Sequence, residues 1–327
     1  MSSDKVIPGS NDAPSHMKPP SFFHKRSIKF YKPIPTIKSA AIIFSVLGVI
    51  FIIVGAVLLA YSLKTIEYKA RYDNKDECQH TTWDKNRTCE VEFEIDKKME
   101  KPVLFYYQLN NFYQNHRRYV KSKSAQQLKY ANMSKEEVSN DCDPIITMKD
   151  LGRAQEDLLP GVREYYESDD KVALPCGLIA KTFFNDTYEI FHGDLKITID
   201  ETDIAWPSDK KNIKSVDDEA ANYWTNVSDE HFIVWMRTSG LPNFRKLWGR
   251  IYEDLEGKYT VRILSKYDVT DFNGEKYVVI STANALGGDN TFLGIAYIVV
   301  GGVVLIVALA FVIRGYFFKK PDNQHFN

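Results

Sequence analysis

The sequence predicts an integral membrane protein in which two transmembrane helices flank a β-rich ectodomain, of the antiparallel α+β type and stapled by disulfides. Residues 40–63 and 292–313 carry no charged side chain. All four cysteines lie between these two runs, together with several stretches of alternating apolar residues. The composition, with 44% hydrophobic residues, excludes a disordered chain, a collagen-like repeat and a cysteine-dense miniature scaffold.

Both uncharged runs are long enough to cross a membrane. They contain 24 and 22 residues and as helices would measure about 36 Å and about 33 Å, against a hydrocarbon core of about 30 Å. A buried core helix is the alternative for either run, but such helices rarely exceed about 18 residues without a charge. A cleaved signal peptide is the alternative for residues 40–63, but the Pro-rich segment 1–39 is long for the charged start of such a signal.

The charges beside the two runs predict which way the chain faces. Residues 1–39 have seven basic and two acidic side chains, a net charge of +5, and residues 314–327 have a net charge of +2. Because the whole chain has a net charge of −1, residues 64–291 carry −8. Basic flanks stay in the cytoplasm. We therefore expect cytosolic tails at 1–39 and 314–327 and a lumenal or extracellular domain at 64–291.

The cysteines indicate an oxidising compartment. Cys78, Cys89, Cys142 and Cys176 all lie in residues 64–291, and an even number there suggests two disulfides. Three pairings are possible, and we favour the two that are local in sequence, Cys78–Cys89 and Cys142–Cys176. A zinc site is the weaker alternative, because the sequence has no Cys-x-x-Cys and no histidine pair at ligand spacing.

Four sequons for N-glycosylation lie in the same part of the chain. Their asparagines are Asn86, Asn132, Asn185 and Asn226, each followed two residues later by serine or threonine. All four fall on the side of the membrane that the charges place outside the cytoplasm. The sequons therefore support a glycosylated ectodomain.

Alternation of apolar and polar residues predicts the strands of this ectodomain. It is clear in three stretches, around Phe93, Ile197 and Val261. Asn273-Gly274 lies between two further apolar stretches and predicts a β-hairpin there. Helical periodicity is concentrated near residues 124–139 and 215–224.

The sequence lacks the motifs that catalysis usually requires. It has no phosphate-binding loop, no His-Glu-x-x-His, no Gly-x-Ser-x-Gly and no Asp-Lys-Thr-Gly. His192-Gly193-Asp194 could form part of a catalytic triad, but such neighbours are expected by chance in this composition. The uncharged spans also argue against an ion path formed by this chain alone. We predict a protein that is not an enzyme, with no cofactor, no metal and no nucleic-acid partner.

Small residues mark one face of each predicted span. Gly48 and Gly55 are seven residues apart in the first, and so are Gly294 and Gly301 in the second. A seven-residue spacing places each pair on one helical face, where small residues allow another helix to approach closely. We expect these faces to pack on each other or on a larger membrane partner, although glycine is also simply common in membrane helices.

The segment Tyr106–Ser122 concentrates aromatic and basic residues. We select as candidate partner-interface residues Asn111, Phe112, Tyr113, Asn115, His116, Arg117, Arg118 and Tyr119. One interpretation is an internal network of arginine–carboxylate pairs and stacked rings that stabilises the fold. The other is a docking surface for lipid headgroups or a protein partner.

This segment closely resembles the hallmark of the phospholipid-flippase β-subunit family that is named after cell division control protein 50. Further matching motifs follow in the same order, over about residues 30–315. They are Leu174–Ala180 with Phe184-Asn185-Asp186, Ile204-Ala205-Trp206, Phe232–Thr238, Leu241–Leu247 and Gly287–Asn290 running into Phe292–Tyr297. In place of the double tryptophan often seen in the family, this chain has Trp206-Pro207.

The resemblance implies a non-catalytic partner of a type IV P-type ATPase, a pump that moves phospholipids from the exofacial to the cytosolic leaflet. Such a subunit would stabilise the pump, form a heterodimer with it, contact membrane lipids and be required for its exit from the endoplasmic reticulum. The resident membrane would be that of the Golgi, an endosome or the cell surface. Two other classes remain open, a two-span subunit of a ligand-gated channel and a membrane-anchored lumenal enzyme.

Overall fold

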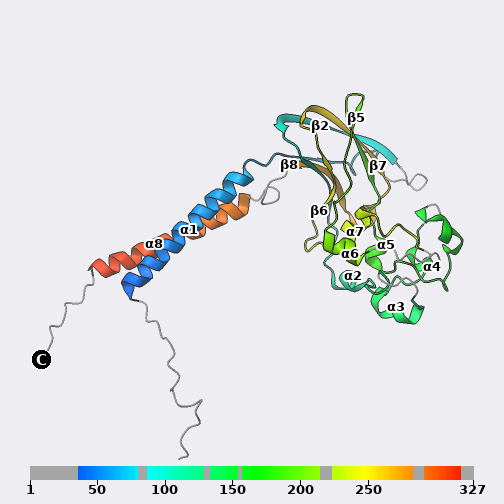
Figure 1. The fold of residues 1–327 in the computed structure, drawn as a ribbon, viewed down its shortest axis with the longest axis horizontal. Helices are drawn as coiled ribbons and strands as arrows, with labels where there is room; N and C mark the ends of the chain where they lie inside the picture. Colours follow the sequence, from blue (N-terminus) through cyan, green and yellow to red (C-terminus); the bar gives the residue numbers. More distant parts are fainter. Residues whose placement is uncertain are drawn as a thin grey trace, which may run out of the picture. The chain divides into compact units, whose positions relative to one another are not determined.

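The computed structural model describes residues 36–79, 87–128, 133–153, 157–213, 223–282 and 291–317 (Figure 1). The chain divides into two compact units. One contains the residues up to Ile52 and those from Val299 onward, and the other contains the residues between them.

Two long apolar helices, α1 (Ile37–Ser62) and α8 (Thr291–Phe317), carry the predicted spans. Among the described residues these two are long and apolar enough to cross a membrane. Only 11% of the most apolar 18-residue window of each is buried inside the chain, which excludes the core helix of a soluble protein. A helix satisfies its own backbone hydrogen bonds, so the uncharged runs can enter lipid only in this form. The chain is an integral membrane protein, while the limits of its cytosolic and lumenal segments stay predictions.

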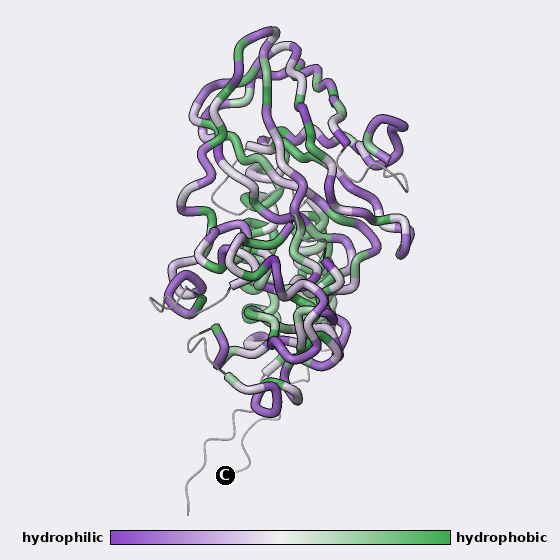
Figure 2. The backbone as a smooth tube through the Cα atoms, turned by 90° about the vertical axis from the view of Figure 1, so that its right-hand side faces the viewer, coloured by the Kyte–Doolittle hydropathy of each residue, from purple (hydrophilic) through white to green (hydrophobic). Residues whose placement is uncertain are grey.

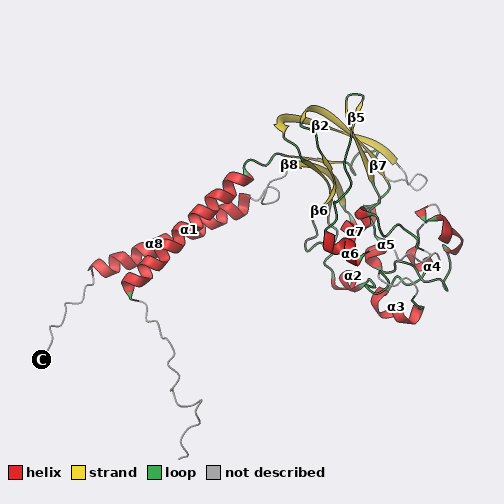
Figure 3. Ribbon diagram, viewed as in Figure 1, coloured by secondary structure: helices red, strands yellow, loops and turns green. Residues whose placement is uncertain are grey.

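The ectodomain contains two antiparallel four-stranded sheets in the described part of the chain. Sheet A has the order β1-β8-β3-β6, and sheet B the order β2-β7-β4-β5 (Figure 3). The strands of sheet A are β1 (Glu67–Arg71), β3 (Val103–Asn110), β6 (Phe244–Ile251) and β8 (Glu275–Thr282). Those of sheet B are β2 (Arg87–Met99), β4 (Thr187–His192), β5 (Leu195–Ile197) and β7 (Leu255–Ser265). The predicted β-rich antiparallel fold class is confirmed.

The inward residues of the two sheets form one core. Buried and exposed residues alternate along β2 and β7, as the alternation in the sequence predicts. Figure 2 shows hydrophobic and hydrophilic stretches following each other along the backbone trace. Aromatic rings join the sheets: Tyr188 of sheet B lies 5.4 Å from Phe105 and 5.0 Å from Trp248 of sheet A, measured between ring centroids. Burying such large rings makes a large apolar contribution to the stability of the ectodomain.

The predicted hairpin at Asn273-Gly274 is wrong. β7 and β8, which flank it, lie in different sheets and do not pair. After β7 the chain leaves sheet B, because the backbone N–H groups of Lys266 and Tyr267 donate to the Asp186 carboxylate instead of continuing the ladder. A short 3-10 helix, η3 (Thr270–Phe272), then ends at Asn273, whose φ of 51° turns the chain into sheet A.

Short helices occupy the two long connections from β3 to β4 and from β5 to β6 (Figure 3). The first connection contains α2 (Arg117–Lys121), α3 (Lys135–Cys142), α4 (Met148–Leu151), the 3-10 helix η2 (Pro160–Tyr165) and α5 (Leu178–Lys181). The second contains α6 (Pro207–Asn212) and α7 (Glu230–Met236). Capping boxes begin α3 and α4, where Ser134 and Thr147 each exchange hydrogen bonds with an acid three residues later.

The helix expected near residues 124–139 is shorter than its periodicity indicates. α3 begins only after Ser134, because the capping box there fixes its first turn, and residues 129–132 are not described. Most of the other helical stretch, 215–224, also lies outside the described residues.

Both expected disulfides are present, and they join the cysteines that are close in sequence. Cys78 is bonded to Cys89 and Cys142 to Cys176, with Cα–Cα distances of 5.3 Å and 5.6 Å. The first bridge joins the segment after β1 to β2, and the second joins the end of α3 to the residues before α5. Each bridge restricts the conformations that are open to the unfolded chain. In the chain-entropy account this stabilises the fold by roughly 3–4 kcal/mol per bridge.

A buried ion pair connects the two sheets. The Lys276 ammonium of sheet A lies 2.8 Å from a carboxylate oxygen of Asp186, directly before β4 of sheet B, and both side chains are at most 1% exposed. Lys276 also donates to Ser265 Oγ and to the carbonyl of Tyr267, so that all three of its N–H groups are used. Tyr72 donates its hydroxyl to Asp186. The pair is therefore fully hydrogen-bonded, as a buried charge requires.

Replacing Lys276 with methionine leaves the Asp186 carboxylate buried without a cation. We expect K276M to lower the free energy of unfolding by about 3–5 kcal/mol, the range for removing one partner of a buried pair. The measurement is chemical denaturation of the full chain in mild detergent. K149M is the matched control, because the exposed Lys149–Asp169 pair should contribute less than about 1 kcal/mol. A loss as small in K276M as in K149M would contradict the role of the pair.

Candidate functional site

The candidate segment begins with a sharp turn at the end of β3. Asn111 has a φ of 61°, in the left-handed region, where asparagine is among the few residues tolerated besides glycine. Its backbone N–H donates to Asn243 Oδ1 at 3.0 Å, and its side-chain amide donates to the carbonyl of Phe272 at 2.8 Å. The next N–H, that of Phe112, donates to the carbonyl of Pro242 at 3.0 Å. Three chain segments are thereby held together at this turn.

Phe112 and Tyr119, two aromatic residues of the segment, pack against the core. The Phe112 ring makes edge-to-face contacts with four rings, at centroid distances of 5.3 to 6.1 Å, and these belong to Tyr119, Trp235, Phe244 and Phe272. The Tyr119 hydroxyl lies 2.7 Å from Thr182 Oγ1, and burial raises the pKa of this tyrosine to about 12. For these rings the stabilising interpretation of the segment is correct.

The basic residues of the same segment face outward. His116, Arg117, Arg118 and Lys121 are all exposed, and so is Tyr113. In the described part of the chain neither Arg117 nor Arg118 forms an ion pair, so the expected arginine–carboxylate network is wrong here. We call these five residues the basic platform. A hollow of about 660 Å³ opens beside it, and four of the five residues line it together with Asp141 and Asp143.

Hydrogen bonds with the loop 239–243 hold the segment that carries the platform. Gln114 accepts a hydrogen bond from the Ser239 N–H at 2.9 Å, and the Asn115 side chain donates to the carbonyl of Gly240 at 2.9 Å. Beside these hydrogen bonds the side chain of Leu241 is 68% exposed, which is unusual for a leucine in a loop that hydrogen bonds fix in place. We missed Leu241 as a candidate. An apolar residue inside the turn motif Gly-Leu-Pro was the available signal.

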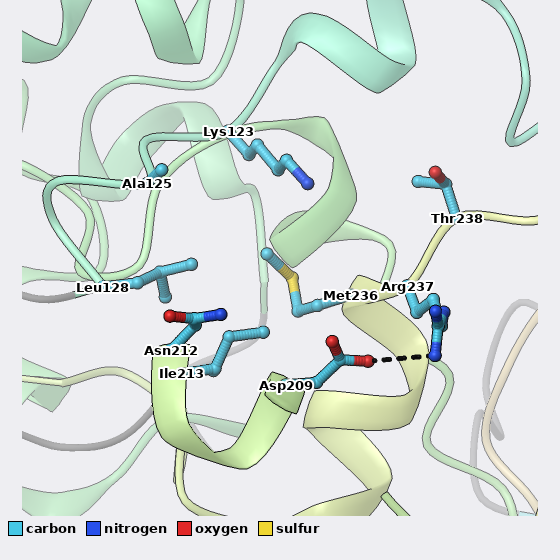
Figure 4. Close-up of a pocket in the computed structure, with 9 residues that line it drawn as sticks. All are labelled: Lys123, Ala125, Leu128, Asp209, Asn212, Ile213, Met236, Arg237 and Thr238. Atoms are coloured by element: carbon cyan, nitrogen blue, oxygen red, sulfur yellow. Dashed lines mark ion pairs between the residues drawn. The ribbon is translucent and has the colours of Figure 1, made fainter. Parts of the chain in front are cut away.

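The buried side chain of Lys246 donates hydrogen bonds to backbone carbonyls at the end of α7, shortly before this loop. Lys246 Nζ donates to the carbonyls of Val234, Trp235 and Arg237. Burial, with a smaller contribution from the charge of Arg237, lowers the pKa of Lys246 to about 7. Arg237 also forms a long ion pair with Asp209, at 3.4 Å, on one side of a cavity of about 470 Å³ (Figure 4). In Figure 4, Lys123 points into this cavity from the opposite side.

The four glycines selected in the spans lie where α1 and α8 meet. A Cβ atom built on Gly48 would lie 2.8 Å from Leu305 and 3.1 Å from the Gly301 carbonyl. A Cβ on Gly55 would lie 2.9 Å from the Gly294 carbonyl. Real Cβ atoms are almost never this close to a neighbour, so only glycine permits this approach of the helices. Phe44 and Phe311 stack farther along, with a centroid distance of 5.8 Å.

The sequons and the possible triad fragment occupy ordinary positions. Asn226 is exposed in a loop and Asn185 is half-buried before β4, while Asn86 and Asn132 lie outside the described residues. His192 ends β4, and Gly193-Asp194 form the turn to β5. The His192 ring stacks on Tyr259 at 4.7 Å, which accounts for it structurally. No group of three or more potential metal ligands occurs among the residues that the structure describes.

These features define a class of protein: a two-span membrane protein whose disulfide-bridged β-sandwich presents exposed arginines that form no ion pair within the described part of the chain. The sequence profile of the LEM3 (ligand-effect modulator 3) family / CDC50 family matches residues 58–321. The chain therefore belongs to the CDC50 family.

Named relatives agree with this assignment. ALA-interacting subunit 3 of Arabidopsis thaliana is 35% identical over 98% of this chain and 93% of its own length. Cell cycle control protein 50A of Bos taurus is 30% identical over 92% of this chain and 90% of its own length. A phospholipid-transporting ATPase accessory subunit, CDC50 of Chaetomium thermophilum, is 28% identical over 95% and 90%. The family consists of accessory subunits and not of catalytic enzymes.

Replacing Gly301 with leucine should separate the two membrane helices, because its Cβ would meet the Gly48 carbonyl at 2.9 Å. G302L is the matched control, since no atom lies within 4 Å of a Cβ on the neighbouring glycine. The readout is disulfide cross-linking of a chain that carries Phe44→Cys and Phe311→Cys. We expect G301L to reduce cross-linking severalfold and G302L to leave it unchanged. Equal cross-linking in both variants would show that the glycine contact is not required.

Replacing Lys246 with methionine should change how stability depends on pH. The folded chain releases this proton near pH 7, whereas the unfolded chain holds it up to about 10.5. Between these values the unfolded state binds more protons, so this lysine makes the free energy of unfolding rise with pH, by at most about 1.4 kcal/mol per unit. We expect this rise between pH 7 and pH 10 in the wild type and in K149M but not in K246M. Parallel curves for all three would contradict the lowered pKa.

Proposed function

We propose that the chain is the non-catalytic β-subunit of a type IV P-type ATPase that moves phospholipid from the exofacial to the cytosolic leaflet. In this function it stabilises the pump, accompanies it out of the endoplasmic reticulum and supports its transport cycle. Membership of a family whose relatives are named phospholipid-transporting ATPase accessory subunits supports the proposal. Both tails would lie in the cytosol and residues 64–291 in the lumen or outside the cell.

The basic platform is the observation that carries this proposal. Arg117, Arg118 and Lys121 are exposed cations in an ectodomain whose net charge is −8, and the two arginines lack carboxylate partners within the described residues. The Phe112 ring of the same segment packs against Trp235 and Phe272, and these contacts hold the platform on the folded domain. Exposed cations on a rigid surface favour an acidic partner and steer its approach. The exoplasmic loops of the pump are the partner that we propose.

The helix pair offers a second contact inside the membrane. The glycine faces of α1 and α8 pack against each other, so a helix of the partner must pack against another face of the pair. Gly302 lies away from that contact, with no atom within 4 Å of a Cβ built on it, and is a small residue at which a further helix could approach. The apolar side chains of both helices remain exposed, among them Ile43 and Val303. Membrane lipids and a pump helix would cover these faces.

The tails would act on the other side of the membrane. Residues 1–39 carry a net charge of +5. Basic segments next to a membrane helix are attracted to the anionic lipids of the cytosolic leaflet. This attraction supports the proposed orientation, in which the pump and its subunit share the Golgi, endosomal or plasma membrane.

Reversing the charge of Arg117 and Arg118 should weaken the complex. We expect the wild-type chain, purified in mild detergent, to retain a large ATPase with lipid-stimulated ATP hydrolysis. In the double variant R117E/R118E we expect at least about tenfold less of this ATPase, equivalent to about 1.4 kcal/mol. Quantitative mass spectrometry of the co-purified proteins gives the measurement.

The control reverses two exposed lysines of sheet B, with Lys97→Glu and Lys258→Glu, and should leave the complex intact. Both double variants have the same change in net charge, so a difference between them reports position. If the chain matured and left the endoplasmic reticulum without any ATPase, the proposed function would be wrong. If the ATPase bound equally to both variants, the platform would not be the interface.

A further inference from the structure

The first membrane helix and the ectodomain are joined by a very short connection. α1 ends at Ser62 and β1 begins at Glu67, so residues 63–66 alone lie between them. Even a fully extended chain spans at most about 18 Å between the Cα atoms of these two residues. Three N–H groups of the connection also donate to carbonyls of the last turn of α1, which shortens it further. The start of β1 therefore lies close to the membrane surface, whichever way the ectodomain is turned.

The register of sheet A carries this constraint to its other strands. Thr282, at the end of β8, donates its N–H to the carbonyl of the residue before β1 at 3.0 Å. Thr282 also pairs with Val103 at the start of β3, which in turn pairs with Ile251 at the end of β6. Residues 100–102 precede β3 and residues 252–254 follow β6, so both segments continue beyond this row. They form the end of the sandwich that faces the membrane helices in the chain.

These two segments are bonded to each other. Asp254 accepts a hydrogen bond from the backbone N–H of Lys101 at 3.0 Å and forms an ion pair with Lys98 at 2.8 Å. One segment leads from sheet B to sheet A and the other leads back, so together they close this end of both sheets. We call residues 98–102 and 252–254 the proximal rim.

The side chains of the proximal rim suit a phospholipid surface. Tyr252 is 55% exposed, and its side chain has no hydrogen bond or ring contact with the residues that the structure describes. Tyrosine is enriched at membrane–water interfaces, where its ring meets the apolar side and its hydroxyl meets water. Beside it stand exposed charges of both signs, on Lys101, Glu100 and Glu253. Such a mixture matches headgroups that carry a phosphate and an ammonium group.

We propose that the proximal rim rests on the zwitterionic phospholipid headgroups of the leaflet on the ectodomain's side, with the Tyr252 ring at headgroup depth. The contact adds a support to the two chain connections, so that the ectodomain does not turn freely about its short link to α1. This inference depends on the two membrane helices and goes beyond the proposed function, since it holds whichever protein the chain accompanies.

The contact also sets the position of the basic platform. The proximal rim lies before the start of β3, and the platform belongs to the segment after its end. β3 has eight residues, and a strand of this length measures about 27 Å. A rim that is fixed on the headgroups therefore holds the platform roughly one strand length from them. A membrane-embedded partner would then meet the platform at a defined height above the bilayer.

The test measures the distance of the rim from lipid headgroups. The two disulfides use all four cysteines, so a single added cysteine can be labelled with a fluorophore. The full-length chain carries Glu253→Cys at the rim or, as the comparison, Leu241→Cys before the opposite end of β6. It is placed in phosphatidylcholine nanodiscs in which some headgroups bear a nitroxide quencher. We expect severalfold stronger quenching at position 253 than at position 241.

Variants of the rim identify the group that holds it on the lipid. In the chain labelled at position 253, Tyr252→Ser should reduce quenching severalfold, whereas Tyr252→Trp should preserve it. Tyr113→Ser is the matched control, because Tyr113 is 57% exposed and lies beyond the other end of β3. Equal quenching at positions 253 and 241, or unchanged quenching in Tyr252→Ser, would overturn the inference. So would a label at 253 that a co-purified ATPase shields but lipid does not quench, because the rim would then be a protein interface.

Discussion

The ectodomain depends on the contact between Asp186 and Lys276, because it is where the two sheets are joined by charge as well as by packing. A buried ion pair contributes to stability only when every remaining donor and acceptor has a partner. Here the ammonium uses all three of its N–H groups, and the carboxylate receives two backbone N–H groups besides the Tyr72 hydroxyl. The same two N–H groups direct the chain from sheet B to sheet A. One carboxylate thus fixes both the contact between the layers and the order of the strands.

This dependence explains which parts of the fold could be predicted. The spans, the disulfides and the alternating strands are encoded by neighbouring residues, so the sequence indicated them directly. The hairpin at Asn273-Gly274 was wrong because its signal is equally local, whereas the chain is redirected before it, at Lys266, by Asp186, which lies 80 residues earlier than Lys266. Nor does anything near Lys276 distinguish it from an exposed lysine, since its burial follows from partners in the other sheet. Strand pairing between distant segments cannot be obtained from periodicity alone.

The candidate surface, too, could be predicted from the sequence only in part. Composition identified the segment from Asn111 to Tyr119, but it could not separate the residues that pack from those that project. The separation comes from the left-handed turn at Asn111 and the hydrogen bonds that hold it, which direct Phe112 into a cluster of rings and leave Arg117 and Arg118 outside. Leu241 was missed because its exposure results from the loop 239–243, which belongs to a different part of the sequence.

The order of synthesis connects the fold with an accessory role. The partners that close the ectodomain lie near its end: Lys276 is in β8, which ends at Thr282, and α8 begins at Thr291. β8 also lies between β1 and β3, so that sheet A has a gap until this strand arrives. The sandwich can therefore close only when the second membrane helix is about to follow. The platform is held by the loop before β6 and by the carbonyl of Phe272, so it is fixed only after these later segments have been made. The ectodomain therefore reaches its folded state only when nearly the whole chain has been made, which is the stage at which the proposed membrane-embedded partner can meet it.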